Sequence, residues 1–177
     1  MLEFPVPILG FAAYSGTGKT TLLRKVIPLL AKKGIRIGMV KHSHHNIDVD
    51  HPGKDSYELR KAGTDQMVLA SPNRTTLIVE HADREDSDLA TALSYLQTDS
   101  LDLVLVEGFK HENIAKIELH RKEMERPFIY PKDNKIIAIV VDKELSLENA
   151  SHLSRLDLNQ PQQISDFIEE FINRYDN

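Results

Sequence analysis

The chain has 177 residues and no cysteine, so we expect one domain over residues 1–177 with no disulfide framework. A net charge of −5, with both signs mixed along the sequence, argues against a nonspecific nucleic-acid binder. The first seven residues include Glu3 and no basic residue, and no apolar run reaches membrane-spanning length. We therefore expect a cytoplasmic protein.

The N-terminal region carries a phosphate-binding pattern. An apolar run at residues 8–13 leads into a loop that ends in Gly-Lys-Thr and opens an amphipathic segment. This is the strand–loop–helix order of a P-loop, with Ala13 where the first glycine usually stands. Glycines let backbone N–H groups turn inward, the lysine carries positive charge for the β- and γ-phosphates, and the threonine hydroxyl can ligate Mg²⁺. The predicted nucleotide-binding residues of the loop are Ser15, Gly16, Thr17, Gly18, Lys19, Thr20 and Thr21.

Strands and helices alternate along the rest of the chain. Pro28 should kink or shorten the first helix, and Gly34 should end it. Further strands are predicted at 35–41, 101–108, 115–120 and 136–141, helices at 55–62, 86–96 and 162–174, and a hairpin at 66–70 and 75–80. The prediction is an α/β, three-layer P-loop NTPase fold: a mostly parallel twisted sheet with helices on both faces and an inserted β-hairpin. The ligand should bind at the carboxyl ends of the strands.

Three acidic residues follow predicted strands at that edge. Glu107 ends a run of four apolar residues, where a carboxylate can hold Mg²⁺ or orient a water. Asp50, preferred over Asp48, could ligate Mg²⁺ or position the attacking water. Asp142 could accept hydrogen bonds from guanine, although the usual Asn-Lys-x-Asp signature is absent. We predict Lys19, Asp50 and Glu107 as catalytic residues, and Thr20, Asp50 and Glu107 as metal ligands.

Four histidines cluster in the loop after the second strand, at His42, His44, His45 and His51. Their spacing fits no compact zinc pattern, and no cysteine is available to complete one. Contacts to phosphate or to a partner are the better interpretation for Lys41 and His42, and Lys54 and Arg60 could serve the same purpose.

Several segments together resemble one family. The sequence AYSGTGKTTL at 13–22, KHSHH at 41–45, DVDHPGKDSY at 48–57 followed by AG at 62–63, and LVEGFK at 105–110 are similar to the molybdopterin-guanine dinucleotide biosynthesis adaptor protein B (MobB) family. These motifs occur in order between about residues 8 and 120. The tail beyond Asp142 carries little of the signature.

The resemblance implies a GTP-binding protein with weak intrinsic GTPase activity, with GTP and Mg²⁺ as ligands. It implies that the partner is the molybdenum cofactor guanylyltransferase MobA, which joins GMP to molybdopterin, and molybdopterin or molybdenum cofactor is a further candidate ligand. It also implies a homodimer built partly through the inserted hairpin. Carried across by motif, Gly16, Gly18, Lys19 and Thr20 bind phosphate and Mg²⁺, and Asp50 and Glu107 lie near the metal.

Two other functions stay open on sequence alone. A P-loop kinase for a small metabolite would need cationic lid residues, for which Arg121 and Arg126 are the candidates. A nucleotide-gated binding module would carry out no chemistry.

Overall fold

The computed structural model describes residues 4–43, 47, 49–81, 88–142, 145–147 and 149–175. The chain divides into two compact units. The core unit comprises Met1–His42 and Asp88–Asn177, and the insert comprises Ser43–Ser87. Among the described residues, no helix has both the length and the apolar character needed to cross a lipid bilayer.

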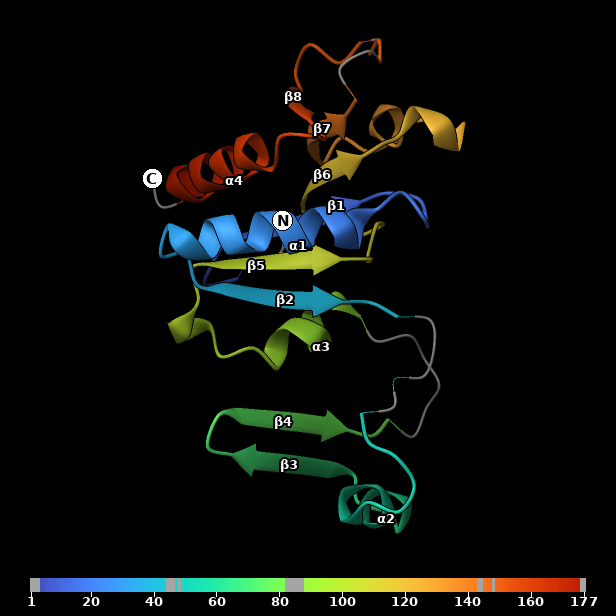
Figure 1. The fold of residues 1–177 in the computed structure, drawn as a ribbon, viewed down its shortest axis with the longest axis vertical. Coiled ribbons are helices and arrows are strands. Elements are labelled where there is room, and N and C mark those ends of the chain that lie inside the picture. The colour runs from blue at the N-terminus through green and yellow to red at the C-terminus, as the bar shows by residue number, and fades with distance from the viewer. Residues whose placement is uncertain are drawn as a thin grey trace. The chain divides into compact units, whose positions relative to one another are not determined.

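The core unit is built on a six-stranded, wholly parallel sheet with the strand order β2-β5-β1-β6-β7-β8 (Figure 1). Parallel strands are covered on both faces, which explains their long apolar runs. The sheet confirms the predicted fold class and four of the predicted strand positions after the P-loop. The strands are β1 (Ile8–Ala12), β2 (Ile37–Lys41), β5 (Leu103–Glu107), β6 (Ala115–Leu119), β7 (Ile136–Val141) and β8 (Ser154–Asp157).

The edge strand β8 was not predicted from the sequence. It has only four residues, and its first two, Ser154 and Arg155, are exposed. Such a short segment shows neither alternation nor an apolar run, so its pairing with β7 defines it as a strand.

Two long helices, α1 (Lys19–Lys32) and α4 (Pro161–Tyr175), lie side by side over one face of the sheet (Figure 1). Pro28 does not shorten α1, which continues to Lys32, and Gly34 follows with a φ of +83° as a helix stop. The largest core lies between these helices and the sheet. It includes Leu22, Leu23, Val26 and Leu30 of α1, Ile164, Ile168 and Ile172 of α4, and Leu9, Leu105, Ile117 and Val140 of the strands.

The opposite face is covered by α3 (Leu89–Ser94) and by loops. Helix α3 packs Leu89 and Leu93 against Val104 and Val106. Asp88 caps it by accepting a hydrogen bond of 2.7 Å from the backbone N–H of Thr91. The helix is shorter than predicted, and its expected first residues, 86 and 87, lie outside the described part of the chain. The loop after β6 contains two single 3₁₀ turns, Lys122–Met124 and Tyr130–Lys132, and a third, Thr98–Ser100, precedes β5.

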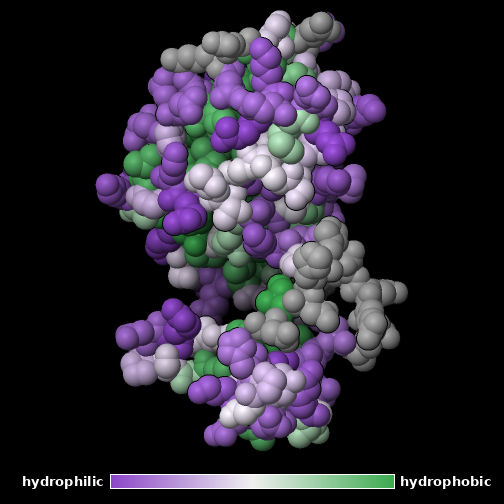
Figure 2. Space-filling model, turned by 45° about the vertical axis from the view of Figure 1, so that its right-hand side comes forward, coloured by the Kyte–Doolittle hydropathy of each residue, from purple (hydrophilic) through white to green (hydrophobic). Residues whose placement is uncertain are grey.

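The insert contains helix α2 (Asp55–Lys61) and the antiparallel hairpin of β3 (Gln66–Ser71) and β4 (Arg74–Val79). Gly63, with a φ of +109°, follows α2, as the sequence predicts. The helix has no buried residue, and hydrophobic surface is visible on the insert at the bottom of Figure 2.

Candidate functional site

The loop between β1 and α1 has the geometry of a phosphate cradle. Gly16 and Gly18 have φ values of +79° and +94°, which side chains with a Cβ rarely adopt. Gly18 is the N-cap of α1 and has no side chain to accept from the first N–H groups of the helix. The Thr17 hydroxyl is buried and donates to the carbonyl of Tyr14 at 2.7 Å, which closes the turn from inside. The backbone donors and the positive end of the α1 dipole are thus directed to one place.

The amine of Lys19 is held inside this loop. It donates hydrogen bonds to the carbonyls of Ala13 at 3.1 Å and Tyr14 at 3.3 Å. Burial lowers the pKa of Lys19; the nearby charge of Glu107 opposes this, and the charges of Lys41 and Lys110 add to the lowering. A half-buried cation crowded by two others gains stability when a multiply charged anion arrives. The arrangement therefore favours a phosphate ligand.

Thr20 and Glu107 are far apart in the sequence, and both are predicted metal ligands. They meet at this edge of the sheet. The Thr20 hydroxyl lies 3.4 Å from Oε1 of Glu107, and Lys41 Nζ lies 3.5 Å from Oε2. Strand pairing explains the second contact, because Lys41 and Glu107 are register partners on β2 and β5. The Glu107 side chain is only 12% exposed. Two oxygen donors at the mouth of a phosphate loop form a set that suits Mg²⁺.

The chain leaves β5 through a tightly packed turn. Gly108 has a φ of +92°, and a Cβ on it would lie 2.6 Å from Cβ of His42. The backbone N–H of His42 donates to the carbonyl of Glu107 at 2.9 Å, and its ring lies 4.6 Å from that of Phe109. Only glycine fits at position 108. Glu107 itself is held by pairing with Phe11 of β1 and Lys41 of β2.

Arg121, from the end of β6, is a site residue that sequence reasoning considered only as a kinase lid. Its Nε donates to the carbonyl of Thr17 at 2.9 Å, and its guanidinium lies 3.6 Å from where a Cβ on Gly18 would be. Met124, on the next turn, lies against Gly16. The strand order β1-β6 brings this segment to the P-loop. No sequence signal marks it, because strand order is not readable from the residues.

Asp142 stands at the carboxyl end of β7, on the same edge of the sheet. Its Oδ2 atom is buried and accepts no hydrogen bond within the part of the chain that is described. A buried carboxylate oxygen without a donor is costly, so the atom is suited to a ligand that brings donors.

Asp50 lies in the insert, where Arg60 holds it. The guanidinium of Arg60 binds both oxygens of the Asp50 carboxylate and also Glu80, and the Asp50 and Arg60 side chains are each less than 10% exposed. The hydrogen bonds from Arg60 lower the pKa of Asp50. The catalytic and metal-binding roles of Asp50 stay predictions, as does any role of Lys54.

Three residues of the loop after β2 that the sequence singles out, His44, His45 and Asp48, lie outside the described residues. Within the described ranges there is no group of three or more His, Cys, Asp or Glu side chains placed to hold a metal ion.

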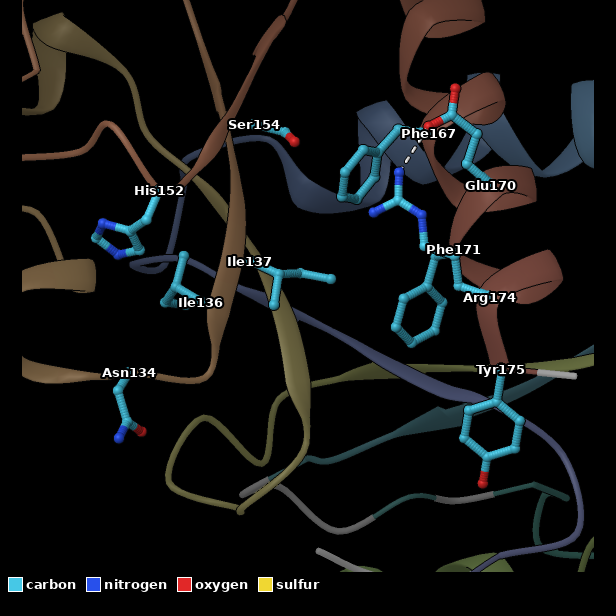
Figure 3. Close-up of a pocket in the computed structure, with 10 residues that line it drawn as sticks. All are labelled: Asn134, Ile136, Ile137, His152, Ser154, Phe167, Glu170, Phe171, Arg174 and Tyr175. Atoms are coloured by element: carbon cyan, nitrogen blue, oxygen red, sulfur yellow. Dashed lines mark hydrogen bonds and ion pairs between the residues drawn. The ribbon is translucent and has the colours of Figure 1, made fainter. Parts of the chain in front are cut away.

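A cavity of about 500 Å³ lies between α4 and the first residues of β7 and β8 (Figure 3). Ile137, Phe167 and Phe171 give it an apolar wall, and Glu170 pairs with Arg174 beside it. These strand residues are at the amino-terminal edge of the sheet, whereas the P-loop follows the carboxyl end of β1. The cavity is therefore separate from the phosphate site.

Comparison with known proteins shows the family. Residues 8–142 match the family model described as "Molybdopterin guanine dinucleotide synthesis protein B", MobB. The chain belongs to the MobB family. The matched region begins with β1 and ends at Asp142, so it contains every site element of the core unit described above.

Two bacterial relatives match over nearly the whole chain. The molybdopterin-guanine dinucleotide biosynthesis adapter protein of Escherichia coli K12 is 49% identical over 96% of this chain and 95% of its own length. The adapter protein of Haemophilus influenzae is 42% identical over 96% of this chain and 92% of its own. A MobB crystal structure superposes with a TM-score of 0.69 at 25% identity, covering 93% of this chain and 99% of that one. The chain is thus similar to MobB adapters in both sequence and fold.

Proposed function

We propose that this MobB-family adapter binds GTP with Mg²⁺, hydrolyses it slowly, and assists the guanylyltransferase MobA, which attaches GMP to molybdopterin. The observation that carries the proposal is the meeting of Lys19, Thr20 and Glu107 at one phosphate cradle. Slow hydrolysis fits the site, because the guanidinium of Arg121 at the P-loop is bonded to a loop carbonyl.

Mg²⁺ would be held by Thr20 and Glu107. Their oxygens, 3.4 Å apart, are the hard donors that this ion prefers, and it keeps water in its remaining positions. The ion would neutralise charge on the β- and γ-phosphates, and Lys19 would bind the same phosphates from the loop. Asp50 is our third candidate ligand, and it would have to exchange Arg60 for the metal.

Asp142 would select guanine. The N1 and N2 groups of guanine are both donors, and a carboxylate is an acceptor only. The buried Oδ2 of Asp142 accepts no hydrogen bond from any described residue. Guanine would supply a donor to this oxygen and so offset the cost of burying it. Adenine presents no such pair of donors.

A homodimer through the insert is part of the proposal. The hairpin exposes Val68 at 62% and its cross-strand partner Leu77 at 45%, and a two-stranded sheet alone has little to bury such side chains. A second copy would cover them.

Sedimentation of Val68→Lys should then give monomer, while Asn73→Lys at the hairpin turn adds the same charge and leaves the dimer intact. A wild-type monomer at micromolar concentration would contradict this.

The central experiment measures binding and hydrolysis of GTP and ATP with Mg²⁺, with and without MobA and molybdopterin. Wild type should prefer GTP, and turnover should be slow. Asp142→Asn should lose GTP affinity and gain affinity for xanthosine triphosphate, because an asparagine amide can donate to the extra carbonyl of xanthine. Asp99→Asn, an exposed acid on the Thr98–Ser100 turn, is the matched control.

Other outcomes would replace the proposal. Transfer of the γ-phosphate to a small metabolite would make the protein a kinase, and binding without turnover under all conditions would make it a nucleotide-gated module. If Glu107→Gln keeps wild-type Mg²⁺ dependence, the metal assignment is wrong.

A further inference from the structure

A second cavity, of about 440 Å³, begins at the P-loop, and most of its lining lies outside the nucleotide site described above. One wall is the turn Ala13–Tyr14, and the others come from the loop between β5 and β6 and from residues 127–135. Its volume falls in the range of small-molecule sites. It lies wholly within the core unit.

Lys116 holds two of these walls together. Its side chain is 2% exposed, and its stem passes over Gly10, where a Cβ would lie 2.8 Å from Lys116 Cγ. The amine donates to the carbonyls of Lys110 at 3.2 Å and Glu112 at 2.6 Å, and it pairs with Asp133 at 2.9 Å. All three donors of this buried amine are therefore used to fix loops around the cavity.

Glu118, two residues further along β6, fixes the remaining wall. It is 1% exposed, and its two oxygens accept hydrogen bonds of 2.8 Å from the backbone N–H groups of Ile129 and Tyr130. Burial raises the pKa of Glu118, and these two hydrogen bonds oppose the shift. Burying two charged residues on one strand is costly, and here both hold the cavity in shape.

The cavity is cationic although the chain is acidic. Its lining contains Lys110, Lys116, Lys132 and Lys135 but only two acids, Glu112 and Asp133, while the whole chain has a net charge of −5. Asp133 is neutralised by Lys116. Among the described residues, the amines of Lys110, Lys132 and Lys135 have no carboxylate partner. Tyr14 and Phe128 add aromatic rings to the lining.

We infer that this cavity binds a phosphorylated pterin, with its ring against Tyr14 and Phe128 and its phosphate among Lys110, Lys132 and Lys135. Lysine amines that have no carboxylate partner in the described ranges, together with an aromatic wall, match the two parts of such a ligand. The family is described by the synthesis of a molybdopterin compound, and a pterin phosphate belongs to that chemistry.

The cavity shares residues with the P-loop site. The carbonyls of Ala13 and Tyr14, which form one wall, hold the amine of Lys19, and the charge of Lys110 acts on that same amine. The inference rests on the proposed function, because it places a pterin phosphate beside the terminal phosphates of bound GTP. The adapter would then hold both compounds that the guanylyltransferase joins.

The test uses neopterin monophosphate, which is stable and fluorescent, titrated into the full-length protein with and without GTP and Mg²⁺. Unphosphorylated neopterin and inorganic phosphate are titrated in parallel. Neopterin monophosphate should bind at least about tenfold more tightly than either, since it makes both sets of contacts. Saturating GTP should not displace it.

The variant is Lys132→Gln/Lys135→Gln, and the matched control is Lys25→Gln/Lys32→Gln, which removes two exposed lysines of α1. The cavity variant should bind the pterin phosphate about tenfold or more weakly, because it loses two charged donors. The control should be unchanged, and both should bind GTP as wild type does and unfold at the same temperature as each other.

Three results would overturn the inference. These are no binding of the probe to wild type, equal affinity in the cavity variant and wild type, or displacement of the probe by GTP, which would place it in the P-loop. Binding of inorganic phosphate as tight as that of the pterin phosphate would reduce the cavity to an anion site. Because GTP binding is measured separately, failure of the proposed function would be seen as loss of GTP binding whatever the probe does.

Discussion

Charged residues are paired differently at the two ends of the strands of the parallel sheet, called here the amino-terminal and carboxyl edges. At the amino-terminal edge, Arg36 binds Asp102 through Nε at 3.0 Å, through Nη2 at 2.6 Å and through its backbone N–H at 2.7 Å. Lys33, at the end of α1, pairs with Asp166 and Glu169 of α4 at 2.6 Å each. At the carboxyl edge, Lys19 bonds only to carbonyls, Lys41 reaches Glu107 at 3.5 Å, and Asp142 has a buried oxygen that accepts from no described residue.

The difference separates stability from function. Closed ion pairs at the amino edge join neighbouring strands and helices. If the proposed function holds, the loosely paired charges at the carboxyl edge cost stability without a ligand, and binding of phosphate, metal and base would restore it. Substitutions at the two edges should therefore have opposite effects on binding and on stability.

Lys19→Ala should give the largest effect, and on binding alone. The loss of a charged donor to phosphate should weaken GTP binding about 10- to 100-fold. The unfolding temperature should stay the same or rise, because the variant removes a cation whose pKa is lowered by burial. Calorimetric titration and thermal unfolding measure the two quantities. A clear fall in the unfolding temperature would contradict the proposal that charges at the carboxyl edge serve binding and not stability.

Asp102→Asn should have the reverse effect. At neutral pH we expect a loss of no more than about 1 kcal/mol in the free energy of unfolding, because water screens this partly exposed pair. Arg36 lowers the pKa of Asp102 to about 2 from 3.8, so its stabilisation is complete above about pH 4 and is lost as the pH falls toward 2. Urea unfolding of both proteins at pH 7 and pH 2 should show the difference shrinking at the lower pH. GTP affinity should not change, and a change would contradict the comparison.

Arg174→Ala, beside the amino-edge cavity, should have the smallest effect. Its pair with Glu170 spans 3.3 Å between side chains that are 78% and 64% exposed. Such an i,i+4 pair contributes less than about 0.5 kcal/mol. Urea unfolding and GTP titration should both lie close to wild type. An altered GTP affinity would mean that this cavity is coupled to the P-loop. It would contradict the expectation that substitutions at the amino edge leave GTP binding unchanged.

Much of the fold could be predicted because its signals are local. Residues 8–22 predict a strand, a phosphate loop and a helix, and the structure has β1, two glycines with positive φ, and α1 there. The hairpin and the stops at Gly34 and Gly63 follow from turn and glycine chemistry in the same way. Strand β8 had no such signal, since two of its four residues are exposed.

The sequence by itself determined the fold class, the phosphate loop and the family, because residue type and spacing carry these properties along a single stretch of chain. Only the tertiary structure decided which residues meet. It brought Glu107 to Thr20, Arg121 to the P-loop, and Lys116 and Glu118 to the loops around the second cavity. These contacts depend on strand order and register, which arise from packing the whole sheet and leave no mark on any one segment.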